Sequence, residues 1–183
     1  MITNKAQSDY EIKKRNLNRV TEEIFTNQSS IDEIKKFLEN NKCEFYNIRD
    51  KSKASGEFKY KLTAEEVLKE VKNYEKFSIY ESLAAADEKL VLQGEIEIKK
   101  DFTVAASLSD VKGISNRTAM QSPVYRLNFN LLEEREPVIR GLKKVVDYVI
   151  KKQLFGMIVE FSLFEIPVGV NKENLIIWEL RNY

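Results

Sequence analysis

A change in the spacing of apolar residues near the middle of the chain constrains its fold more than any other feature. Between residues 92 and 98 every second position is apolar or Gly and the others are polar, and residues 102–108 repeat the alternation with smaller partners. Side chains alternate between the two faces of a strand, so each run predicts a strand with one face toward a core. A turn at Lys100 and Asp101 makes the two strands neighbours in one sheet.

Helices are predicted on the N-terminal side of these strands. Residues 9–26 carry apolar side chains near helical spacing, which favours an amphipathic helix. A second helix starts at Ser30, which forms a capping box with Glu33, and ends at Asn40. A third helix is expected over residues 63–73, because the same capping motif marks its first turn.

The remaining elements follow from shorter patterns, and together they define the fold class. They are a strand over 43–49, a polar loop or hairpin turn over 51–60, a polar loop over 109–121, a strand over 124–129, a helix over 137–151, and strands over 157–164 and 175–180. This order predicts an α+β fold, in which N-terminal helices precede a mainly antiparallel sheet with packed helices. The 183 residues fit a single domain, and two small lobes, 1–89 and 90–183, are the alternative.

The composition excludes several kinds of active site. The sequence contains no histidine and one cysteine, Cys43. Histidine is the usual general base near neutral pH and the commonest transition-metal ligand, so Ser/His/Asp triads, Cys/His dyads and His-ligated zinc are excluded, and one thiol is too few for a thiolate zinc site. Carboxylates, lysine, arginine, hydroxyls and hard ions such as Mg²⁺ remain available for chemistry.

The charge balance and the apolar pattern bear on partners and location. There are 30 Lys and Arg against 29 Asp and Glu, so no overall field draws the chain to nucleic acid or to anionic lipid. No stretch is long and apolar enough for a membrane span, and the single cysteine cannot form an intramolecular disulfide. We therefore expect a cytoplasmic protein with neither a nucleic-acid nor a membrane partner.

Each of the last two predicted strands carries one glutamate among apolar residues. If the strands form a hairpin that turns at Gly169 and Val170, Glu160 lies opposite Glu179 with Cβ atoms roughly 5 Å apart. Two carboxylates so placed repel each other unless a cation such as Mg²⁺ lies between them or one is protonated. A shifted register, or an ion pair with Arg181, is the alternative and would make both glutamates ordinary salt-bridge residues.

The same hairpin predicts which apolar side chains are buried. We expect one face of the two strands to pack against the helix over 137–151. The residues assigned to that face are Val159, Phe161, Leu163 and Trp178.

Several segments resemble those of one enzyme superfamily. They are Phe45-Tyr-Asn-Ile-Arg49 with the loop 52–56, Thr63-Ala-Glu-Glu-Val67, Leu90-Val-Leu-Gln-Gly-Glu-Ile96, Phe155-Gly-Met-Ile-Val-Glu-Phe161 and Ile176-Ile-Trp-Glu179. In this order they resemble the ATP-grasp superfamily, whose members use ATP and Mg²⁺ to activate a carboxylate for attack by a nucleophile. The resemblance extends over most of the chain after the first two helices.

The resemblance implies roles for particular residues and an ATP-grasp-like fold. The implied phosphate contacts are Arg49 with Lys51 or Lys53, and the implied residues near the adenine are Gln93 and Glu95. Arg117 is implied to face the transferred phosphate or the substrate. The implied Mg²⁺ ligands are Glu160 and Glu179 with Asn182. The sequence departs from the family pattern at two points. Asn182 is one position later than in the family's Glu-x-Asn motif, and the phosphate loop is not rich in glycine.

Two functions are compatible with these observations. The resemblance implies an ATP- and Mg²⁺-dependent ligase or phosphoryl-transfer domain that binds a nucleotide. The alternative is a non-catalytic α+β domain that binds a protein partner or forms a homodimer, in which exposed aromatic side chains such as Tyr74, Tyr80 or Tyr125 make the contacts.

Overall fold

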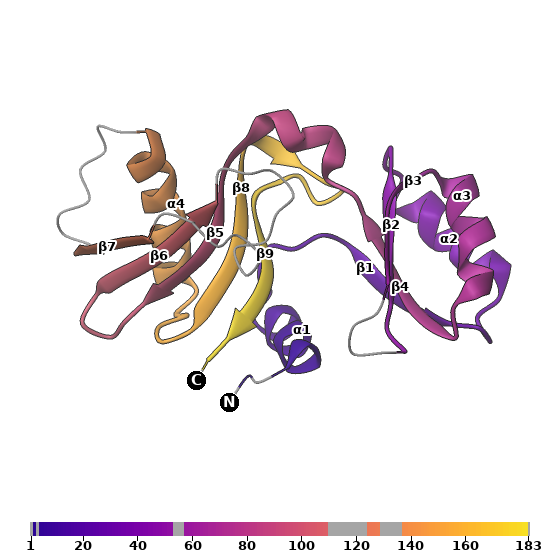
Figure 1. Cartoon of the computed structure of the whole chain (residues 1–183), viewed down its shortest axis with the longest axis horizontal. Coiled ribbons are helices and arrows are strands. Elements are labelled where there is room, and N and C mark those ends of the chain that lie inside the picture. Colours follow the sequence, from indigo (N-terminus) through magenta and orange to yellow (C-terminus); the bar gives the residue numbers. More distant parts are fainter. Residues whose placement is uncertain (1, 3, 53–56, 110–123, 129–136, 183) are drawn as a thin grey trace. The chain divides into compact units, whose positions relative to one another are not determined.

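The chain forms two compact units, each built on one sheet. The computed structural model describes residues 2, 4–52, 57–109, 124–128 and 137–182 (Figure 1). Unit 1 comprises Met1–Arg19, Lys89–Pro167 and Glu173–Tyr183, and unit 2 comprises Val20–Glu88 and Val168–Lys172. Unit 1 contains a five-stranded sheet and unit 2 a four-stranded sheet. The predicted α+β class is confirmed.

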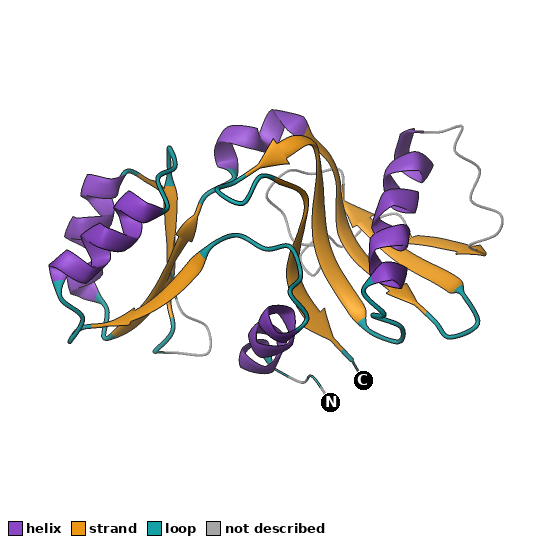
Figure 2. Ribbon diagram, turned by 180° about the vertical axis from the view of Figure 1, so that it is seen from behind, coloured by secondary structure: helices purple, strands orange, loops and turns teal. Residues whose placement is uncertain are grey.

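Unit 2 packs two helices against one face of its antiparallel sheet (Figure 2). Its strands are β1 (Glu22–Thr26), β2 (Tyr46–Asp50), β3 (Phe58–Leu62) and β4 (Lys76–Glu81), in the order β1-β4-β2-β3. Its helices are α2 (Ile31–Asn40) and α3 (Ala64–Glu70), the latter followed by the 3₁₀ helix η1 (Val71–Asn73). The core joins sheet residues to helix residues, among them Phe25, Ile48, Phe77, Ile79, Ile34, Phe37 and Val67.

Local capping signals predicted two helix starts correctly. Ser30 Oγ accepts a hydrogen bond from Glu33 N–H, and the Glu33 carboxylate accepts one from Ser30 N–H. Thr63 and Glu66 make the same reciprocal pair at the start of α3. A capping box satisfies donors that a helix end leaves open, so it can be recognised from a few adjacent residues.

The helix predicted over residues 9–26 is wrong in its second half. Helix α1 covers Lys5–Lys14, and the chain then leaves helical geometry at Asn16, whose φ is 48°. Residues 22–26 form strand β1, which pairs with β4. Ile24, which the helical spacing places on the buried stripe, is 52% exposed, whereas Phe25 is 7% exposed. Pairing with a strand distant in sequence determines this segment, and apolar spacing within the segment does not contain that information.

The predictions for β2 and β3 need smaller corrections. The strand expected over 43–49 begins at Tyr46, because Tyr46 is the first residue of β2 that pairs with β3 and β4. The predicted polar loop over 51–60 is too long, since β3 already starts at Phe58 and pairs with β2. The hairpin alternative for this segment is therefore the correct one.

Unit 1 places helix α4 on its five-stranded sheet. The strands are β5 (Leu90–Ile98), β6 (Thr103–Ser109), β7 (Val124–Asn128), β8 (Ile158–Val168) and β9 (Glu173–Arg181), in the order β7-β6-β5-β8-β9. Helix α4 spans Pro137–Lys151, as predicted, and the 3₁₀ helix η2 (Ala84–Lys89) precedes β5. The predicted turn between β5 and β6 is confirmed, although Phe102, expected in the strand, has a φ of 63° and lies in the turn.

The predicted buried face of β8 is confirmed. Val159, Phe161 and Leu163 are at most 4% exposed. They belong to one cluster with the buried side of α4, which contributes Leu142, Val145, Val146 and Val149. The alternation of apolar residues in β8 therefore determines which side of this strand α4 covers.

The prediction for Trp178 is wrong. Its indole Nε1–H donates a hydrogen bond to Ser162 Oγ at 2.8 Å. Ser162 alternates with the buried apolar residues of β8, so Trp178 lies on the face opposite α4. Ile177 and Leu180 both belong to the core although they are three residues apart, so the two-residue alternation is broken between them. Sequence periodicity could not reveal this irregularity.

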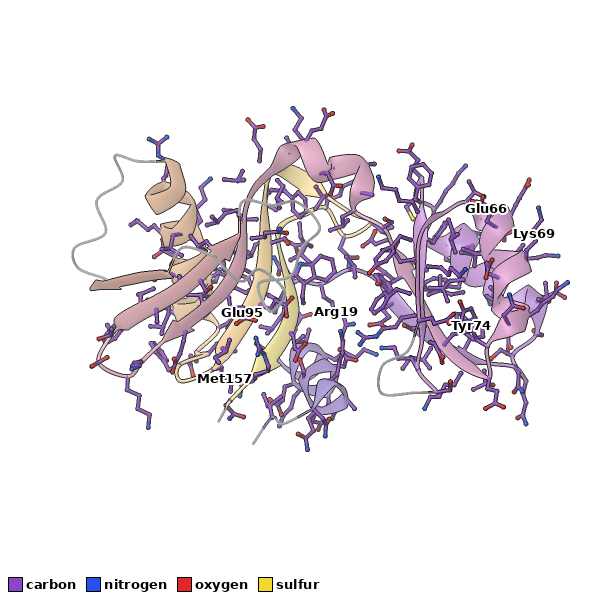
Figure 3. The ribbon with its side chains drawn as sticks, viewed as in Figure 1. Arg19, Glu66, Lys69, Tyr74, Glu95 and Met157 are labelled. Carbon is purple, nitrogen blue, oxygen red and sulfur yellow. The ribbon has the colours of Figure 1, made fainter. Side chains whose placement is uncertain are left out.

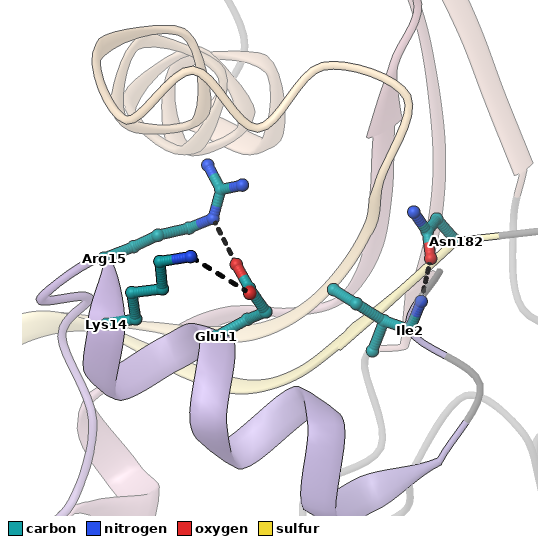
Figure 4. A network of polar contacts seen from close by, with 5 residues as sticks. All are labelled: Ile2, Glu11, Lys14, Arg15 and Asn182. Atoms are coloured by element: carbon teal, nitrogen blue, oxygen red, sulfur yellow. Dashed lines mark hydrogen bonds and ion pairs between the residues drawn. The ribbon is translucent and has the colours of Figure 1, made fainter.

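Helix α1 and the N-terminal residues cover the outer edge of β9. Ser8 Oγ accepts a hydrogen bond from Leu180 N–H at 2.7 Å, and Ile12 is 1% exposed. Figure 4 shows the neighbouring contact in which Ile2 N–H donates to Asn182 Oδ1. The N-terminal segment thereby satisfies polar backbone groups at the edge of the sheet.

The Thr63 cap gives a first prediction (Figure 3 labels its partner, Glu66). Thr63→Ala should lower the free energy of unfolding by about 1 kcal/mol, the usual cost of losing a side-chain N-cap. Thr63→Ser keeps the hydroxyl and should match the wild type in urea unfolding followed by circular dichroism. Equal stability of Thr63→Ala and Thr63→Ser would show that the cap contributes nothing.

A pH series adds a second measurement to this prediction. Hydrogen bonds from the Thr63 backbone and hydroxyl lower the pKa of Glu66 below its ordinary value. A carboxyl whose pKa is lower in the folded state stabilises above its unfolded pKa, and this stabilisation is lost as the pH falls through the folded pKa. The difference between wild type and Thr63→Ala should therefore shrink on acidification.

Candidate functional site

The face of the unit 2 sheet that points away from its helices carries the predicted phosphate contact Arg49. Arg49 alternates along β2 with Ile48, which belongs to the core beneath the helices. Its guanidinium carbon lies 4.7 Å from the centre of the Phe58 ring, and that ring stacks on Tyr60. Among the residues that the structure describes, no carboxylate lies within ion-pair distance of Arg49. Within the described part of the chain, its positive charge therefore lies against an aromatic ring and is not paired with an acid.

Lys51 is engaged by an acid that sequence reasoning missed. Its Nζ lies 3.0 Å from Glu22 Oε1, and the two side chains are only 16% and 13% exposed. Glu22 comes from β1, which was predicted to be helical, so the pair could not have been inferred. Any phosphate contact by Lys51 would have to compete with this carboxylate.

The aromatic residues proposed for the interaction-domain alternative do not form an exposed set. Tyr74 is 8% exposed and packs against Phe77 in the core of unit 2. Tyr80 is half-buried, and burial raises the pKa of its phenol well above the ordinary value. Tyr125 lies in β7, and its side chain is outside the described part of the structure. The expectation that Tyr74 is an exposed contact residue is thus wrong.

Unit 1 brings acidic side chains together on the sheet face opposite α4. Glu95 of β5 pairs directly with Glu160 of β8, while Ile96 and Phe161 beside them belong to the core. Like charges directly opposite each other on neighbouring strands destabilise a sheet. Gln93, the other residue predicted near an adenine, lies two positions earlier on β5 and pairs with Ser162. The Glu95–Glu160 pair was not foreseen, because the predicted register concerned β8 and β9.

Arg181 at the end of β9 brings a positive charge to this face. Its Nη2 forms an ion pair and hydrogen bond with Glu95 Oε1, and its Nε lies 3.7 Å from Glu179 Oε1. The side chains of Arg181, Glu95 and Glu179 are 27%, 20% and 13% exposed. We call Glu95, Glu160, Glu179 and Arg181 the carboxylate cluster. The alternative in which Glu179 forms an ion pair with Arg181 is therefore present in the structure, and Glu95 is a second partner of Arg181.

Three other predicted site residues are placed differently or not described. Asn182 Oδ1 accepts a hydrogen bond from Ile2 N–H, so this oxygen is already used within the protein. Lys53 and Arg117 lie outside the described residues. The opposition of Glu160 and Glu179 stays a prediction. β8 and β9 are neighbours in the sheet.

Glu81 is a buried acid that sequence reasoning overlooked. It ends β4 and is 3% exposed. Its Oε1 accepts a hydrogen bond from Thr21 N–H at 3.1 Å, and its Oε2 accepts one from Val170 N–H at 2.5 Å. A Cβ placed on Gly169 would lie 2.7 Å from Glu81 Oε1. This carboxylate joins the start of β1, the end of β4 and the 168–172 segment within unit 2.

Unit 2 also contains an open cavity of about 400 Å³ between β1 and α2. Its lining includes Glu23, Phe25, Glu33, Lys36 and Phe37. The predicted site residues do not line it. Its lining carries both acidic and basic side chains, and it does not indicate a particular kind of ligand.

A metal ion at the carboxylate cluster would need ligands other than the protein's own side chains. Within the described residues, no group of three acidic, cysteine or histidine side chains is arranged to hold a metal ion. Mg²⁺ in phosphate-binding enzymes usually takes one or two carboxylates and fills its other positions with phosphate oxygens and water. Glu160 and Glu179, the predicted ligands, come from neighbouring strands, and the Asn182 side-chain oxygen already accepts a hydrogen bond from Ile2 N–H.

The fold is similar to that of solved ligase and synthetase structures. The chain matches D-alanine-D-alanine ligase from Coxiella burnetii at 11% identity with a TM-score of 0.53, covering 97% of this chain and 47% of that one. It matches D-alanyl-alanine synthetase A from Vibrio cholerae at 12% identity with a TM-score of 0.54, covering 98% and 54%. The ATP-grasp-like fold expected from the sequence is thereby confirmed.

A third matching structure is that of a synthase. N5-carboxyaminoimidazole synthase from Aspergillus clavatus, solved in complex with ADP and 5-aminoimidazole ribonucleotide, matches at 13% identity with a TM-score of 0.52, covering 98% of this chain and 44% of that one. This chain spans about half the length of the structures it matches. No family model and no curated protein matches the sequence. No helix in the described residues has the length and apolar character that a membrane crossing requires.

Proposed function

We propose that this chain is a nucleotide-binding domain of an ATP- and Mg²⁺-dependent ligase or phosphoryl-transfer enzyme. The observation that carries the proposal is the fold match over 97% or more of the chain to two D-alanine ligases and a synthase. The synthase was solved with ADP, which supports a nucleotide as the ligand. Fold alone does not define a reaction, so the proposal also has to rest on the site residues.

Arg49 is the residue of unit 2 best suited to bind phosphate. Its guanidinium lies on the Phe58 ring on the helix-free face of the sheet. Arginine can bind two phosphate oxygens at once, and an aromatic face leaves that ability intact. Lys53 and Arg117 stay in the proposal as further cations, whereas Lys51 is a weaker candidate because Glu22 already pairs with it.

The proposed metal ligands and adenine contacts are residues of unit 1. Glu160 and Glu179 would hold Mg²⁺, which when bound neutralises charge on phosphate oxygens. Gln93 and Glu95 are proposed near the adenine, where an amide can both donate and accept hydrogen bonds. The acceptor of the transferred group is not part of the proposal.

Nucleotide binding can be tested by thermal unfolding with ATP or ADP, with and without Mg²⁺. A ligand at a hundredfold its dissociation constant stabilises the folded state by about 2.7 kcal/mol. A rise in Tm that needs both nucleotide and Mg²⁺ is the expected result. No shift at millimolar nucleotide and Mg²⁺ would overturn the proposal.

Arg49→Gln is expected to weaken nucleotide binding by about 10- to 100-fold, because a charge-assisted contact to phosphate contributes roughly 1.5–3 kcal/mol. Lys59→Gln is the matched control. It removes one positive charge from the adjacent strand, at a position paired with Ile48 of the core, and should leave affinity unchanged. Isothermal titration with Mg²⁺-ADP measures both variants. Equal losses in both would indicate an effect of net charge instead of a phosphate contact.

A further inference from the structure

We propose that the Glu81 carboxylate is a latch, which fastens the segment between β8 and β9 to unit 2 and opens without unfolding of either unit. The segment comprises residues 168–172. When the latch opens, the two units become freer to move relative to each other. The inference goes beyond the proposed function, because neither nucleotide nor metal binding enters it.

The path of the chain makes the 168–172 segment a noncovalent attachment. Residues 20–88 form one continuous stretch of unit 2, which peptide bonds join to unit 1 at its two ends. Residues 168–172 also belong to unit 2, yet the chain on both sides of them belongs to unit 1. The segment is therefore not directly linked by a peptide bond to the rest of unit 2, and noncovalent contacts hold it there.

Two hydrogen bonds attach the 168–172 segment to the rest of unit 2. Val170 N–H donates to Glu81 Oε2 at 2.5 Å, and Asn171 Nδ2 donates to Thr21 Oγ1 at 3.4 Å. The first is short and charge-assisted, whereas the second is near the upper limit for a hydrogen bond. Of the described residues that form the core cluster of unit 2, none comes from this segment. Glu81 therefore makes the stronger of these two attachments.

Gly169 allows the segment to lie close to the carboxylate. Its φ is +70°, and a Cβ at this position would lie 2.7 Å from Glu81 Oε1. A side chain here would therefore move the segment away from Glu81. Oε1 also accepts a hydrogen bond from Thr21 N–H at 3.1 Å, which fixes the carboxylate from the side of β1. The contact thus combines a fixed acceptor with a position that has no side chain.

Opening of the latch would change how unit 2 is connected. While the segment is fastened, unit 2 is joined to unit 1 at residues 19–20 and 88–89 and also through β8 and β9, which lead directly into the segment. After release, the covalent connections at 19–20 and 88–89 remain. Two chain connections of this kind can act as a hinge between units. The latch therefore determines whether the 168–172 end of β8 and β9 moves with unit 2.

Hydrogen exchange of the Val170 amide in the full chain tests the latch. The amide should exchange through a local opening, so its rate should not depend on urea at low concentration. Glu81→Gln retains the size of the side chain but leaves one acceptor oxygen for two N–H donors. It should accelerate the exchange about tenfold or more, as expected for loss of a charge-assisted hydrogen bond.

Glu165→Gln is the matched control for this measurement. It removes one negative charge at an exposed position of β8 and should leave the exchange rate of the Val170 amide unchanged. The inference would be overturned if the Val170 amide exchanged only through global unfolding, or if Glu81→Gln exchanged at the rate of the wild type.

Gly169→Ala covers the case in which Glu81→Gln does not fold. The added Cβ should separate the segment from an intact carboxylate, and the Val170 amide should again exchange faster. Gly156→Ala is its control, because Gly156 has a φ of +69° and a Cβ there meets nothing within 4 Å. Equal exchange rates of the Val170 amide in the two alanine variants would contradict the latch.

Spin labels test whether the latch restricts motion between the units. Cysteines introduced by Glu39→Cys on α2 and Lys144→Cys on α4, both exposed positions, carry the labels in a Cys43→Ser background. Double electron–electron resonance should give a broader distance distribution with Gly169→Ala than with Gly156→Ala. Equal widths would overturn the inferred effect on the units. These measurements use neither nucleotide nor metal, so their failure would leave the proposed function standing.

Discussion

Replacement of Glu81 by alanine is expected to lower the free energy of unfolding by about 2–4 kcal/mol. The carboxylate is 3% exposed and accepts hydrogen bonds from the backbone N–H groups of Thr21 and Val170. Each buried donor left without an acceptor costs roughly 1–3 kcal/mol, and water that enters the space would recover part of this loss. Urea unfolding followed by far-ultraviolet circular dichroism measures the change. A loss below about 1 kcal/mol would show that these hydrogen bonds are not important for stability.

Gly169 provides an internal check on this prediction. Gly169 and Gly156 have φ values of +70° and +69°, so alanine should be strained by roughly 1–2 kcal/mol at either position. Only at Gly169 does the added Cβ meet the Glu81 carboxylate, whereas nothing lies within 4 Å at Gly156. Gly169→Ala should therefore be the more destabilising of the two. In the Glu81→Ala background the two glycine substitutions should have similar effects, because the clash is gone.

The features that could be predicted from sequence are those determined by neighbouring residues. The capping boxes at Ser30 and Thr63 and the start of α4 at Pro137 each depend on a few adjacent side chains. The alternation in β5 also survives in the structure, because burial of Leu92, Ile96 and Ile98 follows directly from the two-residue period.

The features that could not be predicted depend on strand pairing. Residues 22–26 became a strand because β4 pairs with them, and this pairing gives Lys51 its partner Glu22. Likewise, Glu95 meets Glu160 because β5 lies beside β8, an order that the sequence pattern does not define. Predicted site residues were therefore located on the expected strands, while their actual partners came from elements distant in sequence.

The broken alternation near the end of β9 matters most for the candidate site. In a regular strand, Ile177 and Leu180 would lie on different faces of the sheet, yet both belong to the core. This irregularity changes which neighbours Trp178 and Arg181 reach, and it leads to the contact between Arg181 and Glu95. The metal-site hypothesis consequently has to account for a resident arginine, which the register argument alone did not include.

Replacement of Glu179 by glutamine tests the metal site directly. The variant should lose at least about tenfold in Mg²⁺-dependent nucleotide affinity, since loss of even an outer-shell partner of a metal ligand costs about 10–100-fold. Stability without ligand should change little, because the ion pair with Arg181 Nε spans 3.7 Å and one acid is removed from a group of like charges. Isothermal titration with ADP at several Mg²⁺ concentrations, together with urea unfolding, measures both quantities.

Glu165→Gln is the matched control for this prediction. Glu165 is an exposed residue of β8, so its replacement removes one negative charge from the same pair of strands without affecting the carboxylate cluster. It should retain wild-type nucleotide affinity and Mg²⁺ dependence. If Glu179→Gln destabilises the chain by more than about 1 kcal/mol, the size of a good hydrogen bond, while the Mg²⁺ response stays unchanged, Glu179 is a structural ion-pair residue. The metal site would then have to be abandoned, because it requires Glu179 as one of its two carboxylate ligands.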